Sequence, residues 1–456
     1  MPDMYSLYLL DKDDSGPEFL FPSGHDVFQD VTHAAFGTFC LPCTSEFKEN
    51  DDNSIGLHPA LAEKLKLPFA GKTRILIHDG ILYLGPLIGI FTAGFTDSLL
   101  RPIGERSLFF AKMMSMDQTA GMYTVVFGAH HINWESGTVR GFTYGQKGWS
   151  ELELPFPNVV YDRLPNRKVE NHQALKLVKR RLIEEYGIPW FNPGFFNKWD
   201  IHQTLSSIPE AKGFLPETVL GPSLEQLEQM LSSYRSIYLK PSNGSLGLGV
   251  FQLMYDRKRE CYTCKYRDEA FQNKLKRFPS LEHFFKHAFK ERTLETYLAQ
   301  QGIDLIRQEQ QAIDFRVHTN KNAEGEWNVT AIAAKVAGRG SVTTHLNSGG
   351  IVKTLEELFD DPQNRIRVLN DLTEASILLS RCIDREISGF IGEIGFDLGL
   401  DHQGKIWLFE ANSKPGRSIF SHPKLKDGDL LTRRQFLDYA MFLMRKSIES
   451  PEDIVQ

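Results

Sequence analysis

The chain has 456 residues, of which 41% are hydrophobic and 24% charged, with a formal net charge of −6. This length predicts two or three domains. The mild acidity argues against nucleic-acid partners, because proteins that bind nucleic acid usually carry a basic excess. No apolar run approaches the roughly 20 residues of a membrane-spanning helix. Residues 1–14 lack the basic and apolar segments of a secretory signal, so we expect a cytoplasmic protein without membrane partners.

The pattern of apolar runs and turn-forming residues divides the chain into three expected domains. Residues 1–79 contain short β-like runs broken by turn clusters and predict a small β-rich domain. Residues 80–194 combine strand-like runs with helical patterns, for example over 171–186, which is typical of an α/β domain. Residues 195–456 predict a larger domain that carries the chemistry.

Helices in this last domain are predicted by periodicity and by capping residues. They are expected from Lys198 to Leu205, after a capping box at Ser223 to Gln226, over 372–387 and over 433–447. The C-x-x-C pairs Cys40/Cys43 and Cys261/Cys264 could supply four thiolates to one Zn²⁺. Their separation is far beyond zinc-ribbon spacing, so we predict reduced cysteines.

A strand, a glycine-rich loop and a second strand are predicted between residues 236 and 254. Lys240 ends the first strand, and the loop reads Pro241-Ser242-Asn243-Gly244-Ser245-Leu246-Gly247-Leu248-Gly249. Small residues let backbone N–H groups approach an anion, and Lys240 adds a positive charge. The Walker A, Rossmann and protein-kinase patterns are all absent. The loop therefore predicts a phosphate site, although a glycine-rich hairpin by itself can equally be structural.

The segments after this loop supply amide, charged and flexible groups. Residues 295–304 offer side-chain amides and backbone groups of the sort that contact a purine edge. Alternation along the next strand places three polar side chains on one face: Asp314, Arg316 and His318. Arg339 follows a further strand and precedes a polar loop at 343–350, which could close over phosphates or a substrate.

Residues 392–417 predict a hairpin that carries a metal site. If its turn has four residues, two pairs face each other: Asp397 with Glu410, and Asp401 with Ile406. Facing carboxylates repel, and a divalent cation between them would reverse that cost. Asn412 lies on the same face as Glu410 and adds a neutral oxygen, a donor set that suits Mg²⁺. The alternative is a surface hairpin whose acids face water.

In chain order these features resemble the ATP-grasp superfamily. The matching positions are Lys198, Lys240 with its loop, Gln300 to Asp304, Asp314-x-Arg316, Arg339, Asn347-x-Gly349-Gly350, Asp397 and Glu410-x-Asn412-x-x-Pro415-Gly416. More closely, the whole chain resembles the YheC/YheD family of endospore coat-associated ATP-grasp proteins. The segments that carry this resemblance are Leu84-Gly85-Pro86-Leu87-Ile88-Gly89-Ile90, Val160-Tyr161-Asp162-Arg163, Asn192-Pro193-x-Phe195-x-Asn197-Lys198 and Glu410 to Arg417. The first eighty residues match only loosely.

The resemblance implies an α+β ATP-grasp fold, in which two subdomains clasp ATP, preceded by an α/β domain and a small β-rich domain. It implies ATP and Mg²⁺ as cofactors. The residues expected at ATP are Lys198, Lys240, Ser242, Gly244, Ser245, Gly247, Gln300, Gln301, Ile303 and Asp304, the last as the ribose contact. Those expected at Mg²⁺ are Asp397, Glu410 and Asn412. Those expected in catalysis are Arg339, Arg316 and Asn347.

Three functions fit these residues. The first is an ATP-dependent carboxylate–amine ligase acting through an acyl phosphate, with small-molecule or peptide substrates. The second is an ATP-grasp kinase, which needs the same nucleotide site and no amine pocket. The third is a spore-associated protein that binds ATP without turnover. The resemblance implies association with the spore and spore coat proteins as partners.

Overall fold

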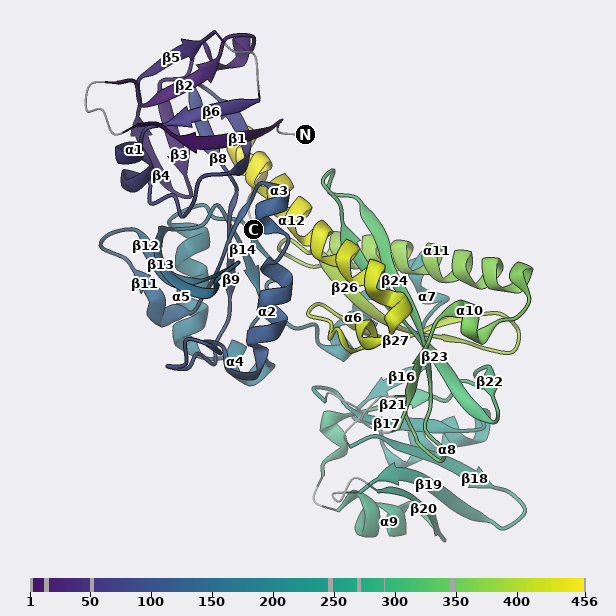
Figure 1. Ribbon diagram of the computed structural model, residues 1–456. Helices are drawn as coiled ribbons and strands as arrows, with labels where there is room; N and C mark the ends of the chain where they lie inside the picture. The colour runs from purple at the N-terminus through teal and green to yellow at the C-terminus, as the bar shows by residue number, and fades with distance from the viewer. Residues whose placement is uncertain are drawn as a thin grey trace.

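The computed structural model describes residues 3–11, 16–49, 53–244, 249–268, 272–290, 292–344 and 349–454. The described strands form four sheets, which follow one another along the chain (Figure 1). A long C-terminal helix, yellow in Figure 1, runs between the second and the fourth of them. Within the described residues, we find no helix with the length and apolar character needed to cross a membrane.

The first sheet is built from short strands of the N-terminal region. They are β1 Asp3–Leu9, β2 Phe19–Pro22, β3 His33–Phe36, β4 Phe39–Pro42, β5 Ser45–Lys48, β6 Ser54–Leu57, β7 Lys72–His78 and β8 Ile81–Leu84. Their order is β4-β3-β8-β7-β1-β6-β2-β5, and helix α1 (Pro59–Lys64) follows β6. The sheet continues through β8, past residue 79, where we expected the β-rich domain to end.

The second sheet has a parallel centre. Its strands are β9 Leu87–Phe91, β10 Tyr123–Phe127, β11 Ile132–Asn133, β12 Thr138–Gly145, β13 Gly148–Pro155, β14 Val159–Asp162 and β15 Trp190–Phe191. The helices between them are α2 Ser107–Met114, α3 Asp117–Ala120, α4 Arg167–Glu170 and α5 Gln173–Glu184. Strands β10, β9, β14 and β15 pair in parallel, and the first three are buried throughout. Burial on both faces explains why their sequences are continuous apolar runs.

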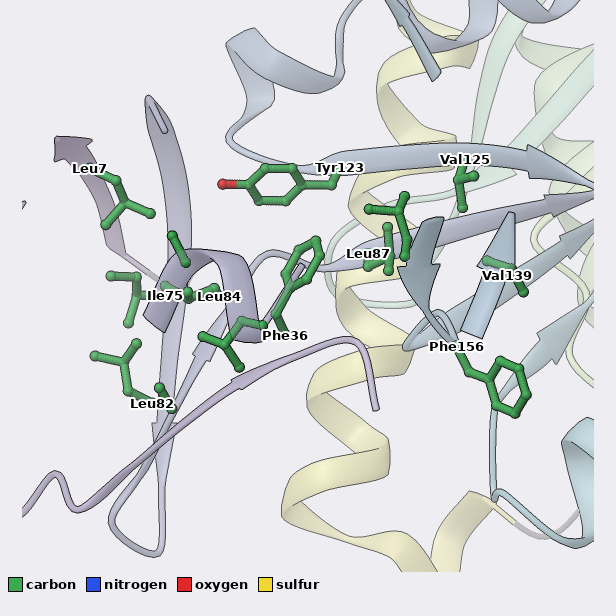
Figure 2. Close-up of a cluster of buried hydrophobic side chains, with 14 of the residues drawn as sticks. Leu7, Phe36, Ile75, Leu82, Leu84, Leu87, Tyr123, Val125, Val139 and Phe156 are labelled. Carbon is green, nitrogen blue, oxygen red and sulfur yellow. The ribbon is translucent and has the colours of Figure 1, made fainter. Parts of the chain in front are cut away.

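The first and second sheets share one hydrophobic core. Leu7, Leu82 and Leu84 from the first sheet are in the same buried cluster as Leu87 and Val125 from the second (Figure 2). A hydrogen bond of 2.6 Å between the hydroxyl groups of Thr73 and Tyr123 also crosses the junction. The two N-terminal sheets are therefore packed against each other without an intervening linker.

The third sheet is entirely antiparallel and follows the order β16-β21-β17-β18-β19-β20. Its strands are β16 Thr218–Leu220, β17 Ile237–Pro241, β18 Phe251–Asp256, β19 Cys261–Arg267, β20 Asn273–Phe278 and β21 Tyr297–Gln301. Helices α8 (Leu224–Ser233) and α9 (Leu281–Phe284) contribute to its core. The predicted capping box is confirmed, because Ser223 and Gln226 each accept a hydrogen bond from the other's backbone N–H.

The fourth sheet is also antiparallel, in the order β25-β24-β23-β26-β27 with β22 beside β23. Its strands are β22 Arg307–Gln308, β23 Gln311–Lys321, β24 Trp327–Val336, β25 Ile351–Lys353, β26 Glu393–Leu400 and β27 Ile406–Asn412. The helices associated with it are α6 Lys198–Ser206, α7 Pro209–Lys212, α10 Leu355–Leu358, α11 Pro362–Glu386 and α12 Lys426–Glu449. Helix α11 begins ten residues before its predicted start, because Asp361 caps it and Pro362 occupies its first turn.

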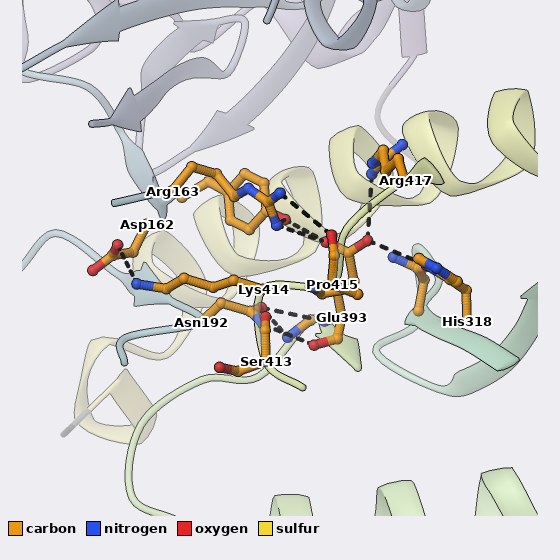
Figure 3. A network of polar contacts seen from close by, with 12 residues as sticks. Asp162, Arg163, Asn192, His318, Glu393, Ser413, Lys414, Pro415 and Arg417 are labelled. Carbon is orange, nitrogen blue, oxygen red and sulfur yellow. Dashed lines mark hydrogen bonds and ion pairs between the residues drawn. The ribbon is translucent and has the colours of Figure 1, made fainter. Parts of the chain in front are cut away.

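Helix α12 and a buried asparagine join the second sheet to the fourth. Apolar side chains of α12 are in one buried cluster with residues of β9 and β14, while the helix also contacts β23 and β24. Asn192 follows β15 with a φ of 53° and is fully buried. Its amide accepts hydrogen bonds from the backbone N–H groups of Gly392 (2.9 Å) and Glu393 (3.2 Å), and donates to the carbonyls of Glu393 and Ser413. Both N–H donors and both acceptor positions of this side chain are therefore used to hold β26 and the loop after β27 in place (Figure 3).

The carboxylate of Glu393 is the charged centre of the same junction. Its side chain is 3% exposed and accepts a hydrogen bond from the hydroxyl of Tyr161. Guanidinium nitrogens of Arg417 and Arg163 lie 3.3 and 3.6 Å from its oxygens (Figure 3). Burial by itself raises the pKa of Glu393, but Arg417, His318 and Arg163 together outweigh it and bring that pKa to about 2.

A pH-dependent contribution to stability is expected from Glu393. Because its pKa is lower than the ordinary 4.5, the stabilisation is complete above about pH 4.5 and is lost as the pH falls toward 2. Glu393→Gln should lower the free energy of unfolding at pH 7 by roughly 3–5 kcal/mol, since it leaves buried guanidiniums unpaired. Thermal unfolding from pH 7 to pH 3 should show the difference from wild type shrinking. The exposed Glu63→Gln is the control, and a pH-independent difference would contradict the assignment.

Candidate functional site

A cavity of about 240 Å³ lies between the third and the fourth sheet. Strands β17 and β21 contribute to it from the third sheet, and strands β23, β24, β26 and β27 contribute from the fourth. Lysines, acids, amides and aromatic rings line it, among them Lys198, Tyr238, Lys240, Gln300, Lys335, Asp397, Phe409 and Glu410. Cations and carboxylates therefore lie together in one cavity, where each charge must be balanced by another.

Lys240 extends from the end of β17 into this cavity. Its ammonium group donates a hydrogen bond of 2.6 Å to the side-chain carbonyl of Gln300 and lies 5.5 Å from the ring centres of Tyr238 and Phe409. Burial lowers the pKa of Lys240 to about 8, against the opposing effect of nearby acids. The group is therefore a largely protonated cation at neutral pH, in a setting where a bound anion would stabilise it.

The predicted pairing of Asp397 with Glu410 across β26 and β27 is confirmed. The second predicted pair is wrong, because Ile406 faces Leu400 rather than Asp401. A bulge at Phe409 shifts the register by one residue between these positions, so that the four-residue turn predicted from the sequence does not apply to the whole hairpin.

Cations neutralise the two facing carboxylates. Arg316 donates two hydrogen bonds of 3.0 Å to Asp397, one to each oxygen, and the Lys335 ammonium lies 2.8 Å from the same carboxylate. The Lys198 ammonium lies 3.4 Å from an oxygen of Glu410. The repulsion argued from the sequence is thus relieved by side chains, without requiring a metal ion for the fold.

The donor set still fits a hard divalent cation. Asp397 and Glu410 face each other across β26 and β27, and both line the cavity. Glu410 is 25% exposed, and Asn412 lies two residues further along β27. Two carboxylates and an amide oxygen are ligands that Mg²⁺ accepts while keeping waters and phosphate oxygens.

The comparison with known proteins agrees with this geometry. The family model described as "YheC/D like ATP-grasp" matches residues 187–443, which include both halves of the cavity. The chain belongs to this family. It is 48% identical over 427 residues to the endospore coat-associated protein YheD of Bacillus subtilis (strain 168), covering 92% of this chain and 93% of that protein. The family resemblance and the α+β ATP-grasp fold predicted from the sequence are thereby confirmed.

Two further similarities were found. The endospore coat-associated protein YheC of Bacillus subtilis (strain 168) is 28% identical over 271 residues, covering 59% of this chain and 73% of that protein. A crystal structure of D-alanine–D-alanine ligase from Bacillus anthracis, complexed with ATP, aligns with 80% of this chain and 100% of that one, at 12% identity and a TM-score of 0.45.

Lys335 is a site residue of this ATP-grasp protein that the sequence reasoning missed. It is buried on β24, and its ammonium lies 3.0 Å from Asp314 and 2.8 Å from Asp397. Asp314 faces it directly across β23 and β24 and also accepts a hydrogen bond from Thr344. The sequence feature that could have indicated its role is a single lysine within an otherwise largely apolar strand, Thr330-Ala331-Ile332-Ala333-Ala334-Lys335-Val336-Ala337.

The structure brings most of the predicted site residues together. Those that line the cavity are Lys198, Lys240, Gly244, Gln300, Gln301, Ile303, Asp397 and Glu410. Arg316 lies against Asp397, whereas Arg339 is exposed beyond the end of β24. Asp304, expected at a ribose, instead forms ion pairs with Arg235 (3.7 Å) and Arg307 (3.3 Å).

Four other predicted positions lie away from the cavity lining or outside the described residues. The backbone N–H of Ser242 donates to the carbonyl of Thr296, which fixes the start of the glycine-rich loop. Ser245, Gly247 and Asn347 lie outside the described residues.

The four-thiolate zinc alternative is excluded by the fold. Cys40 lies on β4 of the first sheet, and Cys261 and Cys264 lie on β19 of the third. In the part of the chain that the structure describes, no three His, Cys, Asp or Glu side chains gather as a metal cluster, and its cysteines are free thiols.

Replacing Lys335 should destabilise the fold strongly. Lys335→Met keeps most of the side-chain volume but leaves Asp314 and Asp397 close together without their shared cation. Breaking a buried ion pair in this way costs roughly 3–5 kcal/mol. Urea unfolding at pH 7 should show this loss, while the exposed Lys72→Met should be close to wild type. Equal stability of the two variants would mean that Lys335 is not needed to balance these acids.

Proposed function

We propose that this protein is an ATP- and Mg²⁺-dependent carboxylate–amine ligase that forms ADP. The observation that carries the proposal is the cavity in which Lys198, Lys240 and Lys335 converge on Asp397 and Glu410, in a chain of the ATP-grasp family. Cations that can bind phosphates and carboxylates that can bind a divalent ion are the two requirements of phosphoryl transfer.

In the proposed complex the third sheet binds the nucleotide. Lys198 and Lys240 contact the phosphates, and the Gly244 end of the glycine-rich loop covers them, consistent with the hydrogen bond from Lys198 to the Gly244 carbonyl. Gln301 and Ile303 lie at the cavity wall, on the side where the purine would bind. The apolar faces of nearby side chains would exclude water from the transferred phosphoryl group.

The reaction proceeds in two displacements. A substrate carboxylate oxygen attacks the γ-phosphorus of ATP and the bond to the β,γ-bridging oxygen breaks, giving ADP and an acyl phosphate. An amine then attacks the acyl carbon, its proton is lost, and phosphate leaves with the electrons of the C–O bond. Mg²⁺ held by Asp397, Glu410 and Asn412 would neutralise charge on the phosphoryl oxygens. Arg316, which is hydrogen-bonded to Asp397, would stabilise the acyl phosphate.

We also propose that the protein acts in the spore. The support is its similarity to YheD, which is named as an endospore coat-associated protein. Small-molecule or peptide carboxylates and amines would be its substrates, and spore coat proteins its partners.

Lys240 is predicted to contribute directly to nucleotide affinity. Lys240→Met removes the charge and keeps much of the apolar stem. Since a hydrogen bond to a charged group contributes roughly 1.5–3 kcal/mol, ATP affinity should fall about ten- to a hundredfold. Calorimetric titration with ATP·Mg²⁺ measures this, with the exposed hairpin residue Lys405→Met as the control. Unchanged ATP affinity would make the glycine-rich loop a purely structural element.

Glu410 is predicted to be required for the metal dependence. Glu410→Gln preserves the shape of the side chain but removes one negative charge from a site for a dication. The Mg²⁺ concentration that gives half-maximal ADP release should rise at least tenfold, because the loss of one charged contact to the metal weakens its binding by about this factor. The exposed Glu374→Gln on α11 should leave it unchanged. An unaltered Mg²⁺ requirement in Glu410→Gln would place the metal elsewhere.

Hydroxylamine distinguishes the ligase from the other functions. It is a small, strong nucleophile and should convert an acyl phosphate into a hydroxamate when the correct carboxylate is present with ATP and Mg²⁺. A kinase acting on an alcohol would release ADP and form a phosphate ester that hydroxylamine leaves intact. A binding protein would form neither product. Screening carboxylates, amino acids and short peptides by mass spectrometry measures this, and AMP as the product would reject the proposed chemistry.

A further inference from the structure

A group of buried and half-buried arginines lies where the second sheet meets the loop after β27. Its charged members are Arg106, Arg163, Arg417, Arg433, Glu393 and Asp429. Four guanidiniums are thus matched by two carboxylates. The neighbouring Lys414 is paired with two acids, Asp162 (2.6 Å) and Glu170 (3.2 Å), so that a surplus of one positive charge remains when these three residues are included. We call these four arginines the arginine cluster.

Two members of the arginine cluster, Arg163 and Arg417, are held by their carboxylate partners only at long distances. Arg163 is 8% exposed, and its nearest contact with Glu393 is 3.6 Å, too long for a hydrogen bond. Its guanidinium donates instead to the hydroxyl of Tyr161 (3.3 Å) and the carbonyl of Pro415 (3.5 Å). Arg417 is 9% exposed, reaches Glu393 and Asp429 at 3.3 and 3.4 Å, and its buried Nε has no partner among the described residues. By contrast, Arg316 makes two 3.0 Å hydrogen bonds to one carboxylate in the same chain. One buried donor of the cluster, the Nε of Arg417, is therefore unused among the described residues.

Arg106 adds a further positive charge to this group. Its guanidinium donates hydrogen bonds to the hydroxyl of Thr92 (2.8 Å) and the carbonyl of Arg163 (2.6 Å), and it lies 4.8 Å from the ring centre of Phe110. No ion pair with a described carboxylate is found for it. Burial, together with the charge of Arg163, lowers the pKa of Arg106 to about 10. Like charges held this close in a poorly solvated place are favourable only if an anion offsets them.

The arginine cluster is joined to the reaction site by one strand. Glu393 and Asp397 lie on the same face of β26, four residues apart, and hence roughly 13 Å from each other along the strand. That distance is spanned by three or four residues of extended peptide.

We propose that the arginine cluster binds a second, non-reacting anionic group of the substrate, a carboxylate or a phosphate. This inference rests on the proposed function and names its substrate class: a short peptide, or a molecule of similar length, with an anionic group at the end remote from the reacting carboxylate. Guanidiniums bind both kinds of oxyanion through paired N–H groups, so the chemistry of the cluster is the same for either source.

The test uses the full chain, first saturated with the non-hydrolysable analogue AMP-PNP and Mg²⁺. Three probes are titrated by calorimetry: N-acetyl-Glu-Ala-Ala, N-acetyl-phosphoserine-Ala-Ala and the uncharged match N-acetyl-Gln-Ala-Ala. At least one anionic probe should bind about tenfold or more tightly than the Gln peptide, as a charged hydrogen bond predicts. The anionic probe that binds more tightly shows whether the arginine cluster prefers a carboxylate or a phosphate.

Substitutions test whether the preference for an anionic probe arises from the arginine cluster. Arg106→Gln and Arg417→Lys should each reduce it at least threefold; the second keeps the charge, so that the fold is preserved while paired N–H geometry is lost. Arg140→Gln, whose side chain is 71% exposed on β12, should retain the full preference. Equal binding of the three probes by wild type, or a preference unaffected in both variants, would overturn the inference. The same three probes are also titrated without nucleotide. Failure to bind AMP-PNP would contradict the proposed function, but the anionic and uncharged probes could still be compared in this second series.

Discussion

The buried carboxylate of Glu393 is the interaction on which the arrangement of the second and fourth sheets depends. Tyr161 approaches it from β14, Arg163 from the residue that follows this strand, and Arg417 from the loop after β27. Beside it, the amide of Asn192 fixes the backbone of β26. These contacts come from three separate stretches of chain, so their geometry is maintained only when all three are packed together. A buried carboxylate with cations on two sides is costly to disrupt, which makes the junction rigid.

This rigidity extends to the cavity because successive side chains of a strand alternate between its faces. Glu393, Gly395 and Asp397 lie on one face of β26. At Gly395, an added Cβ would lie 2.4 Å from the Cβ of Pro415 and 3.1 Å from a guanidinium nitrogen of Arg316. The absence of a side chain there lets the loop after β27 cross the strand closely while Arg316 still reaches Asp397. Anchoring one end of β26 therefore also positions the acid at the other end.

Positive side chains are concentrated at two places in a chain whose net charge is negative. The net charge is −6, yet the cavity gathers Lys198, Lys240 and Lys335, and the neighbouring junction gathers four arginines. Acids of the fourth sheet offset the lysines, and the offset at the junction is incomplete. A reaction that brings a nucleotide, a carboxylate and a divalent ion together needs both signs of charge in separate, fixed places. The two adjacent groups of charges are consistent with such a division.

Local patterns in the sequence were sufficient to predict several features of the fold and the candidate site. The capping box at Ser223, the hairpin of β26 and β27, and the facing of Asp397 and Glu410 depend on residues close together in the chain. Alternation on β23 likewise predicted that Asp314 and Arg316 share a face, and both reach the acids and lysine of the site. These features follow from backbone hydrogen bonding and side-chain alternation, which act over a few residues.

Only the tertiary structure decided which charges meet. The bulge at Phe409 changes the register within the hairpin, and no turn residue signals it. Lys335 is brought to Asp397 by the pairing of β24 with β23 and of β23 with β26. Arg163 and Arg417 come from positions more than 250 residues apart, and they meet at Glu393 because β14 packs against α12 and its Tyr161 reaches β26. Contacts of this kind depend on how whole sheets pack, and a sequence pattern describes only the chain on either side of each residue.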